Sequence, residues 1–536
     1  MSEVYANILE ALTSGLYNEP KYALREYLQN AYDAITQAKI EKLPQFDEYA
    51  IKIEITKNNK IITITDNGVG MGKALLEEYT SIGGGTKNSP VFTGNKGIGK
   101  LSGLRFFHNF RVRTKTSGSS KAYELDWKCG EMISVVMNQK NKMKVTPYKN
   151  FIEDYYSIKE IDEEDANSHF TQVQLIDVTD EFHDRVSEEI LGNFIKQNCP
   201  VPFNGDQFQH AERINKWLEI NSDAVNTFIN DKVIYQFYNN SDNLVEPILV
   251  EIKYDDSIKA KAWISWISDS SGTIENDEIQ GIRFRCKGFC IGDSNLFANN
   301  CMPPGREFAA SWFTGEIVVL AENIIPSAAR DKFSEGADIV KFFSELQRKL
   351  GKQLVLIAET RSTIKNSEDD LIKINKYINE GQIVPLSLWK HANNNLKELQ
   401  KCKIKDKYNF DFGVIERLQN LVKSEEEKEL NKTSPVIVNP GEPLCSKPIE
   451  AIEKLLELKE EQDNSFFPKI KAKKQEQIDQ IKNYLVNTSD KSQEDESQEE
   501  NIYIFTNIII KYLESIHISY DKTKVVEFIR NEIRRR

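Results

Sequence analysis

Residues 24–35 read Leu24-Arg-Glu-Tyr-Leu-Gln-Asn-Ala-Tyr-Asp-Ala-Ile35, and their spacing predicts one amphipathic helix over residues 20–38. Glu26, Asn30 and Asp33 are spaced i, i+4 and i+7, so they share one face of this helix. On the opposite face, which we expect to pack against a sheet, lie the apolar side chains Leu24, Leu28, Ala31 and Ile35. Two carboxylates and an amide on one face suit a hydrated magnesium ion and a water nucleophile, but an ordinary solvated face has the same pattern.

A β-hairpin is predicted after the helix. Residues 49–56 and 61–65 alternate apolar and polar side chains, with a short polar turn between them. The second strand runs directly into residues 66–71, Asp-Asn-Gly-Val-Gly-Met. Asp-Asn-Gly alone is a common turn signal, but a buried Asp66 at the end of a strand could accept a hydrogen bond from an adenine amino group. The two glycines would let a flat ring approach the backbone.

A glycine-rich stretch covers residues 83–103 and begins with Gly-Gly-Gly-Thr at residues 83–86. Further on, Gly94 to Lys100 has the G-x-x-x-x-G-K spacing of a P-loop, but Leu101 occupies the position where Ser or Thr must bind magnesium. The backbone N–H groups of such glycines can still cradle phosphates where a helix begins, and Lys100 could add a charge there. A merely flexible loop is the alternative interpretation.

In this order the motifs resemble those of the GHKL ATPases, the superfamily of gyrase, heat-shock chaperones, histidine kinases and MutL. The resemblance implies an α+β fold, the two-layer α/β sandwich known as the Bergerat fold, which binds and hydrolyses ATP with Mg²⁺. It also implies roles for the helix, with Glu26 as the general base, Asn30 as the Mg²⁺ ligand and Asp33 as a supporting polar contact.

The later motifs complete the nucleotide site that the resemblance implies. Phe170-Thr-Gln-Val-Gln-Leu175 is similar to the last motif, in which Thr171 would share a water molecule with Asp66 and the adenine. Phe170 departs from the family pattern, because a glycine commonly stands there. The adenine-binding residues would be Asp66, Gly68, Gly70 and Met71. The mobile lid and its phosphate-binding end would comprise residues 83–85, Gly94, Gly97, Ile98, Gly99 and Lys100.

Residues 200–350 resemble the second α/β domain, a transducer or middle domain, of GHKL machines such as the chaperone HtpG, MutL and MORC proteins. Residues 316–333 predict a strand and a loop, followed by a helix from about residue 339. The resemblance makes Arg330 the catalytic residue that contacts the terminal phosphate, with Lys332 in reserve. A guanidinium can make paired hydrogen bonds to phosphate oxygens and a lysine cannot, although a surface Arg-Asp pair in a loop is the alternative.

The length of 536 residues suggests about three or four domains. The resemblance covers residues 10–350, and beyond them we recognise no family motif. We expect a GHKL ATPase domain at residues 1–190, a transducer-like domain at 200–350, a mainly helical region at 365–485, an acidic linker at 486–500 and a C-terminal segment at 501–536.

Composition narrows the functional classes. With 40% hydrophobic and 28% charged residues, the chain resembles a soluble globular protein. The net charge of -12 does not indicate nucleic acid as a partner, although a local basic groove stays open. Without a long apolar run or a secretory signal pattern, we expect no membrane partner and a cytoplasmic location. The scattered cysteines suggest reduced thiols, because zinc at Cys286 and Cys290 would need further ligands.

Two functional interpretations stay open. In the first, the chain is a homodimeric, ATP-driven clamp with chaperone-like action on a protein partner. The loop within residues 316–333 and the acidic charge favour it. In the second, it is a nucleic-acid-processing or antiviral-defence ATPase of MORC or MutL type that acts with a DNA or nuclease partner. A histidine kinase is disfavoured, because such enzymes place their catalytic domain last. The lid glycines and the leading segment 1–19 would allow two ATPase domains to close on each other.

Overall fold

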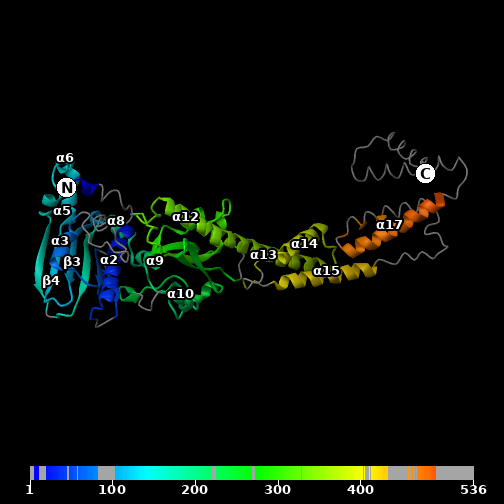
Figure 1. The fold of residues 1–536 in the computed structure, drawn as a ribbon, viewed down its shortest axis with the longest axis horizontal. Coiled ribbons are helices and arrows are strands. Elements are labelled where there is room, and N and C mark those ends of the chain that lie inside the picture. The colour runs from blue at the N-terminus through cyan, green and yellow to red at the C-terminus, as the bar shows by residue number, and fades with distance from the viewer. Residues whose placement is uncertain are drawn as a thin grey trace. The chain divides into compact units, whose positions relative to one another are not determined.

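The computed structural model describes residues 5–10, 20–81, 103–432 and parts of 457–489. Short gaps inside these ranges are residues 45–47, 57, 59, 164, 220–224, 269–271, 328, 403, 405–407, 409, 411, 459–460, 463–464 and 466. The chain divides into two compact units, residues 1–359 and residues 360–536. The first unit contains two β-sheets, and the described part of the second unit is helical (Figure 1).

The first sheet has eight strands in the order β5-β4-β3-β6-β2-β1-β7-β8. All neighbours are antiparallel except β1 and β7, which are parallel. The strands are β1 (Ala50–Ile55), β2 (Ile61–Asp66), β3 (Phe107–Lys115), β4 (Lys121–Trp127), β5 (Tyr156–Asp162), β6 (Phe170–Val178), β7 (Asn226–Ile229) and β8 (Lys232–Val233). The predicted hairpin is confirmed by the pairing of β1 with β2, whereas β7 and β8 join the sheet from a later part of the chain.

Helix α2 (Pro20–Glu41) packs against the inner face of this sheet. Its predicted apolar face is buried, because the side chains of Leu24, Leu28, Ala31 and Ile35 are each at most 3% exposed. The outer face of the sheet carries polar pairs such as Arg111–Asp126 at 2.7 Å. The other helices of this domain are α3 (Lys73–Tyr79), α5 (Cys129–Asn138), α6 (Lys140–Met143), α7 (Tyr148–Ile152), α8 (Asp180–Arg185) and α9 (Glu188–Asn198). The domain has the predicted α+β fold, with helices layered on a sheet.

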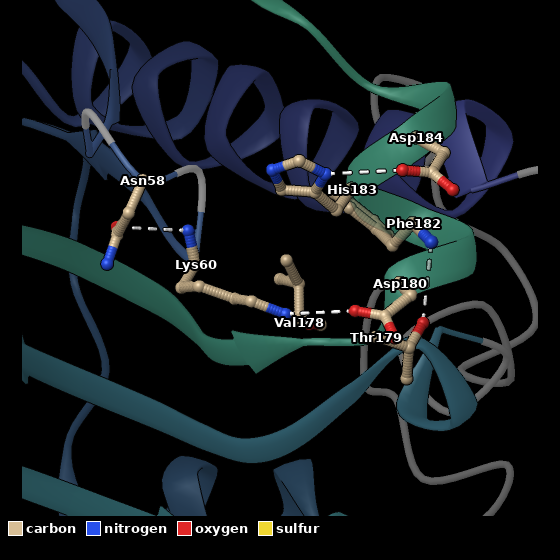
Figure 2. Close-up of polar contacts among 8 residues, drawn as sticks. All are labelled: Asn58, Lys60, Val178, Thr179, Asp180, Phe182, His183 and Asp184. Carbon is tan, nitrogen blue, oxygen red and sulfur yellow. Dashed lines mark hydrogen bonds and ion pairs between the residues drawn. The ribbon is translucent and has the colours of Figure 1, made fainter.

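At the end of β6 the chain turns into α8, and the loop between β1 and β2 lies beside this turn (Figure 2). Thr179 caps the helix, because its Oγ1 atom accepts a hydrogen bond from the N–H of Phe182 at 3.4 Å. Lys60 Nζ lies 3.3 Å from the carbonyl oxygen of Val178 and 3.2 Å from Asp180 Oδ1. The exposed Lys60–Asp180 pair contributes at most about 1 kcal/mol, so strand pairing chiefly fixes this end of the sheet.

The second sheet has five strands in the order β12-β11-β13-β10-β9. They are β9 (Ile248–Tyr254), β10 (Ser257–Ser265), β11 (Gly281–Cys286), β12 (Phe289–Ile291) and β13 (Thr314–Val319). The helices of this domain are α10 (Ala211–Leu218), α11 (Ser294–Cys301) and α12 (Ala337–Leu346). Phe284 of β11 is ringed by four aromatic side chains, those of Phe297, Phe333, Phe342 and Phe343. The strand and helix predicted around residues 316–339 are confirmed by β13 and α12.

The described part of the C-terminal unit is helical, as predicted. Its helices are α13 (Lys352–Asn379), which begins in the first unit, α14 (Leu386–Gln400), α15 (Gly413–Lys432) and α17 (Pro468–Ser489). Trp389 and Phe467 pack edge to face in its core with ring centroids 5.3 Å apart. Helix α17 continues into the acidic linker predicted at residues 486–500, so the helical region ends later than predicted. The rest of that linker and the segment 501–536 lie outside the described residues. Among the described helices, none combines the length and apolar composition needed to span a lipid bilayer.

Candidate functional site

Three buried polar side chains form a row across the inner face of the first sheet. Asp66, the last residue of β2, lies directly opposite Thr171 of β6, and Thr171 lies opposite Thr114 of β3. Opposed residues on antiparallel strands point to the same face. Apolar positions adjoin the row on the same face: Ile64 precedes Asp66 on β2, and Val173 follows Thr171 on β6. Burial of a carboxylate and two hydroxyl groups is costly unless they are hydrogen-bonded, so this end of the sheet is built for polar contacts.

Hydrogen bonds connect the row to the turn that follows β2. Asp66 Oδ1 accepts from the N–H of Gly68 at 2.9 Å. Thr114 Oγ1 accepts from the N–H of Met71 at 2.8 Å, donates to the carbonyl oxygen of Phe170 at 2.9 Å, and lies 3.2 Å from Thr171 Oγ1. Sequence reasoning missed Thr114, because its place in the row depends on how β3 aligns with β6.

Close packing explains why Gly68 and Gly70 of this turn are glycines. A Cβ atom on Gly68 would lie 2.5 Å from the backbone carbon of Ala34 on α2. Gly70 has a φ of +68°, and its Cβ would lie 1.8 Å from the carbonyl oxygen of Lys115. The turn is therefore held between α2 and the end of β3, and only glycine allows both approaches. The idea that these glycines admit a flat ring stays a prediction.

Tyr79, at the end of α3, lies near both of the main acidic candidates. Burial raises the pKa of its phenol, and the carboxylates of Glu26 and Asp66 raise it further. Glu26 on α2 and Asp66 on β2 thus lie around one aromatic side chain, although 40 residues separate them in sequence. Asn30 follows Glu26 by one helical turn and is likewise half-buried. No sequence motif marks Tyr79, so it was also missed.

Asp33 lies on the same helix, and its carboxylate acts electrostatically on Lys287 at the tip of the hairpin formed by β11 and β12. Burial lowers the pKa of Lys287 at this tip, and the Arg330 cation acts in the same direction, whereas Cys286 and Asp33 oppose them. Asp33 is itself only 1% exposed. The role of Asp33 as a supporting polar contact stays a prediction.

The segment that carries Arg330 contacts α2 directly. Arg25, which precedes Glu26, donates from NH2 to the carbonyl oxygen of Ala329 at 2.6 Å. Arg330 is buried, with its guanidinium 6.0 Å from the centroid of the Phe289 ring. The Phe289 ring in turn packs edge to face on Tyr32 of α2 at 5.8 Å. These contacts bring the Arg330 segment to the helix of the candidate site.

Lys332, the reserve candidate, is exposed and lies 3.3 Å from Glu335. The predicted lid residues cannot be placed, because residues 83–85, Gly94, Gly97, Ile98, Gly99 and Lys100 lie outside the described residues.

The described part of the chain holds no cluster of three or more His, Cys, Asp or Glu side chains suited to a metal ion. The amide oxygen of Asn30 fits a magnesium ion that takes its remaining ligands from nucleotide phosphates and water.

The structure has a buried carboxylate at a strand end, threonines on the adjoining strands and a helix with a carboxylate and an amide, as expected for a domain of the GHKL class. The first domain belongs to this superfamily. Residues 17–167 match the family described as histidine kinase-, DNA gyrase B-, and HSP90-like ATPase.

Similar proteins include chaperones named HtpG. The chain is 28% identical over 141 residues to chaperone protein HtpG of Polaromonas naphthalenivorans, which covers 23% of this chain and 22% of that protein. It is 24% identical over 212 residues to HtpG of Mycobacterium leprae, covering 35% and 30%. It is 26% identical over 231 residues to HtpG of Buchnera aphidicola, covering 40% and 34%. The matched region thus spans between 22% and 34% of these relatives.

Proposed function

We propose that the chain binds and hydrolyses ATP with Mg²⁺, and that a homodimer uses this cycle to act as a clamp on a protein partner. The buried row of Asp66, Thr171 and Thr114 carries the nucleotide part, because it offers a carboxylate acceptor and hydroxyl groups beside a fixed turn. The family match and the likeness to HtpG chaperones support the hydrolytic and clamp parts.

Each residue has a distinct task in this proposal. Asp66 accepts a hydrogen bond from the adenine amino group, and Thr171 supports it through water. Glu26, half-buried beside Tyr79, accepts a proton from the attacking water, and Asn30 holds Mg²⁺. When bound, Mg²⁺ neutralises charge on the phosphates and orients them. Asp33 is a supporting polar contact on the same helix.

A protein partner and a nucleic-acid partner are distinguished by what stimulates turnover. We expect denatured protein to raise the ATPase rate of the purified chain and double-stranded DNA to leave that rate unchanged. The net charge of -12 supports this expectation. Stimulation by DNA alone would instead support the MORC-like or MutL-like interpretation, in defence or nucleic-acid processing.

Asp66→Asn is expected to weaken ATP binding at least about tenfold, because it replaces the acceptor and leaves polar groups in the pocket unpaired. Isothermal titration calorimetry on the folded variant measures this. Asp162→Asn is the matched control, since Asp162 also ends a strand but is exposed and pairs with Lys121. Near-normal affinity in Asp66→Asn, with Asp162→Asn also unchanged, would contradict the proposed adenine site.

Arg330→Ala is expected to lower ATP turnover at least about tenfold, because the guanidinium would stabilise charge on the terminal phosphate. ADP affinity should change little, since ADP lacks that phosphate. Steady-state turnover at saturating ATP and calorimetry with ADP give the two values. Lys332→Ala is the comparison, and a larger loss of turnover there would transfer the role to Lys332. An equal loss of ADP binding in Arg330→Ala would also exclude the assigned role.

A further inference from the structure

The side chain of His169 lies between two backbone carbonyl groups. The residue immediately precedes β6 and is 7% exposed. Its Nδ1 atom lies 2.7 Å from the carbonyl oxygen of Gly68, and its Nε2 atom lies 2.8 Å from the carbonyl oxygen of Pro44. Both distances are those of hydrogen bonds, so each ring nitrogen faces an acceptor.

Only a ring that carries two protons can donate to both oxygens at once. A carbonyl oxygen accepts and never donates, and a neutral imidazole has a single N–H group. In the neutral ring, one nitrogen would turn its lone pair toward a carbonyl oxygen at hydrogen-bond distance. The imidazolium donates from both nitrogens, and a charged donor makes the stronger hydrogen bond.

The two carbonyl groups belong to segments that support Asp66. Gly68 lies in the turn after β2, where its N–H donates to Asp66 Oδ1. Pro44 lies just after α2, and His169 lies just before β6. The ring therefore ties together the end of α2, the turn after β2 and the start of β6, which are the segments on which the polar row is built.

Charged groups of both signs lie on the segments around the ring. On β3, the buried Lys115 donates from Nζ to the carbonyl oxygen of Ser168, one residue before His169, at 2.7 Å. The turn after β2, the segment after α2 and the loop before β6 contribute Asp66, Lys42, Glu48 and Asp165. Positive and negative charges therefore both surround the ring. The observation that favours the imidazolium over the neutral ring is the pair of carbonyl oxygens at hydrogen-bond distance.

We propose that His169 is a positioning residue of the adenine site, whose ring donates from both nitrogens and so holds the Gly68 turn to the Pro44 segment. The inference rests on the proposed function, because His169 acts through the turn that supports Asp66. Without the hydrogen bond to Gly68 the turn is held less firmly, and ATP affinity falls.

Two substitutions separate the two hydrogen bonds. The amide nitrogen of asparagine can take the place of Nδ1, and that of glutamine can take the place of Nε2, and neither amide titrates. His169→Asn therefore keeps the donor to Gly68, whereas His169→Gln keeps the donor to Pro44. Because the Gly68 turn supports Asp66, His169→Gln should bind ATP more weakly than His169→Asn.

ATP affinity is measured by calorimetry. His169→Gln is expected to bind ATP about threefold to tenfold more weakly than His169→Asn. His183→Asn is the matched control, because His183 is partly exposed on α8 and lies 3.4 Å from Asp184 (Figure 2). It should bind ATP as tightly as the wild type does.

Equal ATP affinity in His169→Gln and His169→Asn would overturn the inference. If the wild type binds no ATP, the proposed function itself fails, so the two failures are distinguishable. Circular dichroism checks that the variants fold. If they do not, proton–nitrogen spectra of histidine-labelled wild type decide the question, with His169 assigned by replacing the other histidines. A His169 ring with a single protonated nitrogen would overturn the inference.

Discussion

Glu26→Ala is expected to bind ATP and to hydrolyse it at least about a hundredfold more slowly than the wild type, because a general base contributes about 10²–10⁴ to the rate. Glu26 lies on α2, whereas the adenine contacts are assigned to the end of β2, so the substitution removes the base and leaves those contacts in place. Single-turnover hydrolysis, with ATP affinity measured by calorimetry on the same protein, separates the two effects.

Glu41→Ala is the matched control for this variant. Glu41 is the last residue of the same helix, is exposed, and accepts a hydrogen bond from Gln37 one turn earlier. Its loss should leave turnover at the wild-type rate. Wild-type turnover in Glu26→Ala would exclude Glu26 as the base, and equal slowing in both variants would point to a general effect on the helix.

The same variant tests the clamp. If ATP closes two chains on each other, Glu26→Ala with ATP and Mg²⁺ should accumulate as a closed dimer, and ADP should not produce it. A shift from mostly open to mostly closed needs a difference in ATP binding of about 5 kcal/mol between the two states. Light scattering with each nucleotide reports the mass. A monomer under every nucleotide condition would exclude the clamp and leave the ATP site unaffected.

Glu316→Ala is expected to lower the free energy of unfolding by about 3–5 kcal/mol, because it leaves a buried cation without its counter-ion. Glu316 on β13 and Arg285 on β11 form an ion pair at 2.6 Å, and both side chains are at most 6% exposed. Arg285 also donates to the carbonyl oxygens of Gln197 and Cys199 at the end of α9. The pair therefore links the second sheet to the ATPase domain.

Denaturant unfolding followed by tryptophan fluorescence measures this loss, with Asp255→Ala as the control. Asp255 pairs with Lys341 at 2.6 Å, but both side chains are at least half exposed, so its removal should cost at most about 1 kcal/mol. The double variant Glu316→Leu with Arg285→Met should regain part of the loss, because it leaves no buried charge. An unchanged midpoint in Glu316→Ala would contradict the assignment.

Most of the elements that could be predicted from the sequence follow from patterns among residues close together in the chain. The 3.6-residue period of α2 and the alternation of β1 and β2 depend on neighbouring residues alone, and both are present. The opposition of Asp66 and Thr171 agrees with the family motifs, because those motifs already encode the pairing of β2 with β6.

Contacts between distant segments could not be predicted in the same way. Thr114 enters the polar row through the alignment of β3 on β6. Tyr79 and His169 reach it through the packing of a short helix and a loop. Such positions depend on tertiary packing, which cannot be read from the periodicity of a single segment.

The parallel pairing of β7 with β1 decides where the chain can be cut. Residues 226–229 follow the ATPase motifs by about fifty residues of sequence, yet they form the neighbour of β1 in the first sheet. A fragment ending between residues 190 and 200 would lose this neighbour and leave β1 as an open edge. Open edges recruit strands from other molecules, so such a fragment would self-associate for reasons unrelated to ATP. A fragment that keeps the first sheet complete must therefore extend at least through β8, to residue 233.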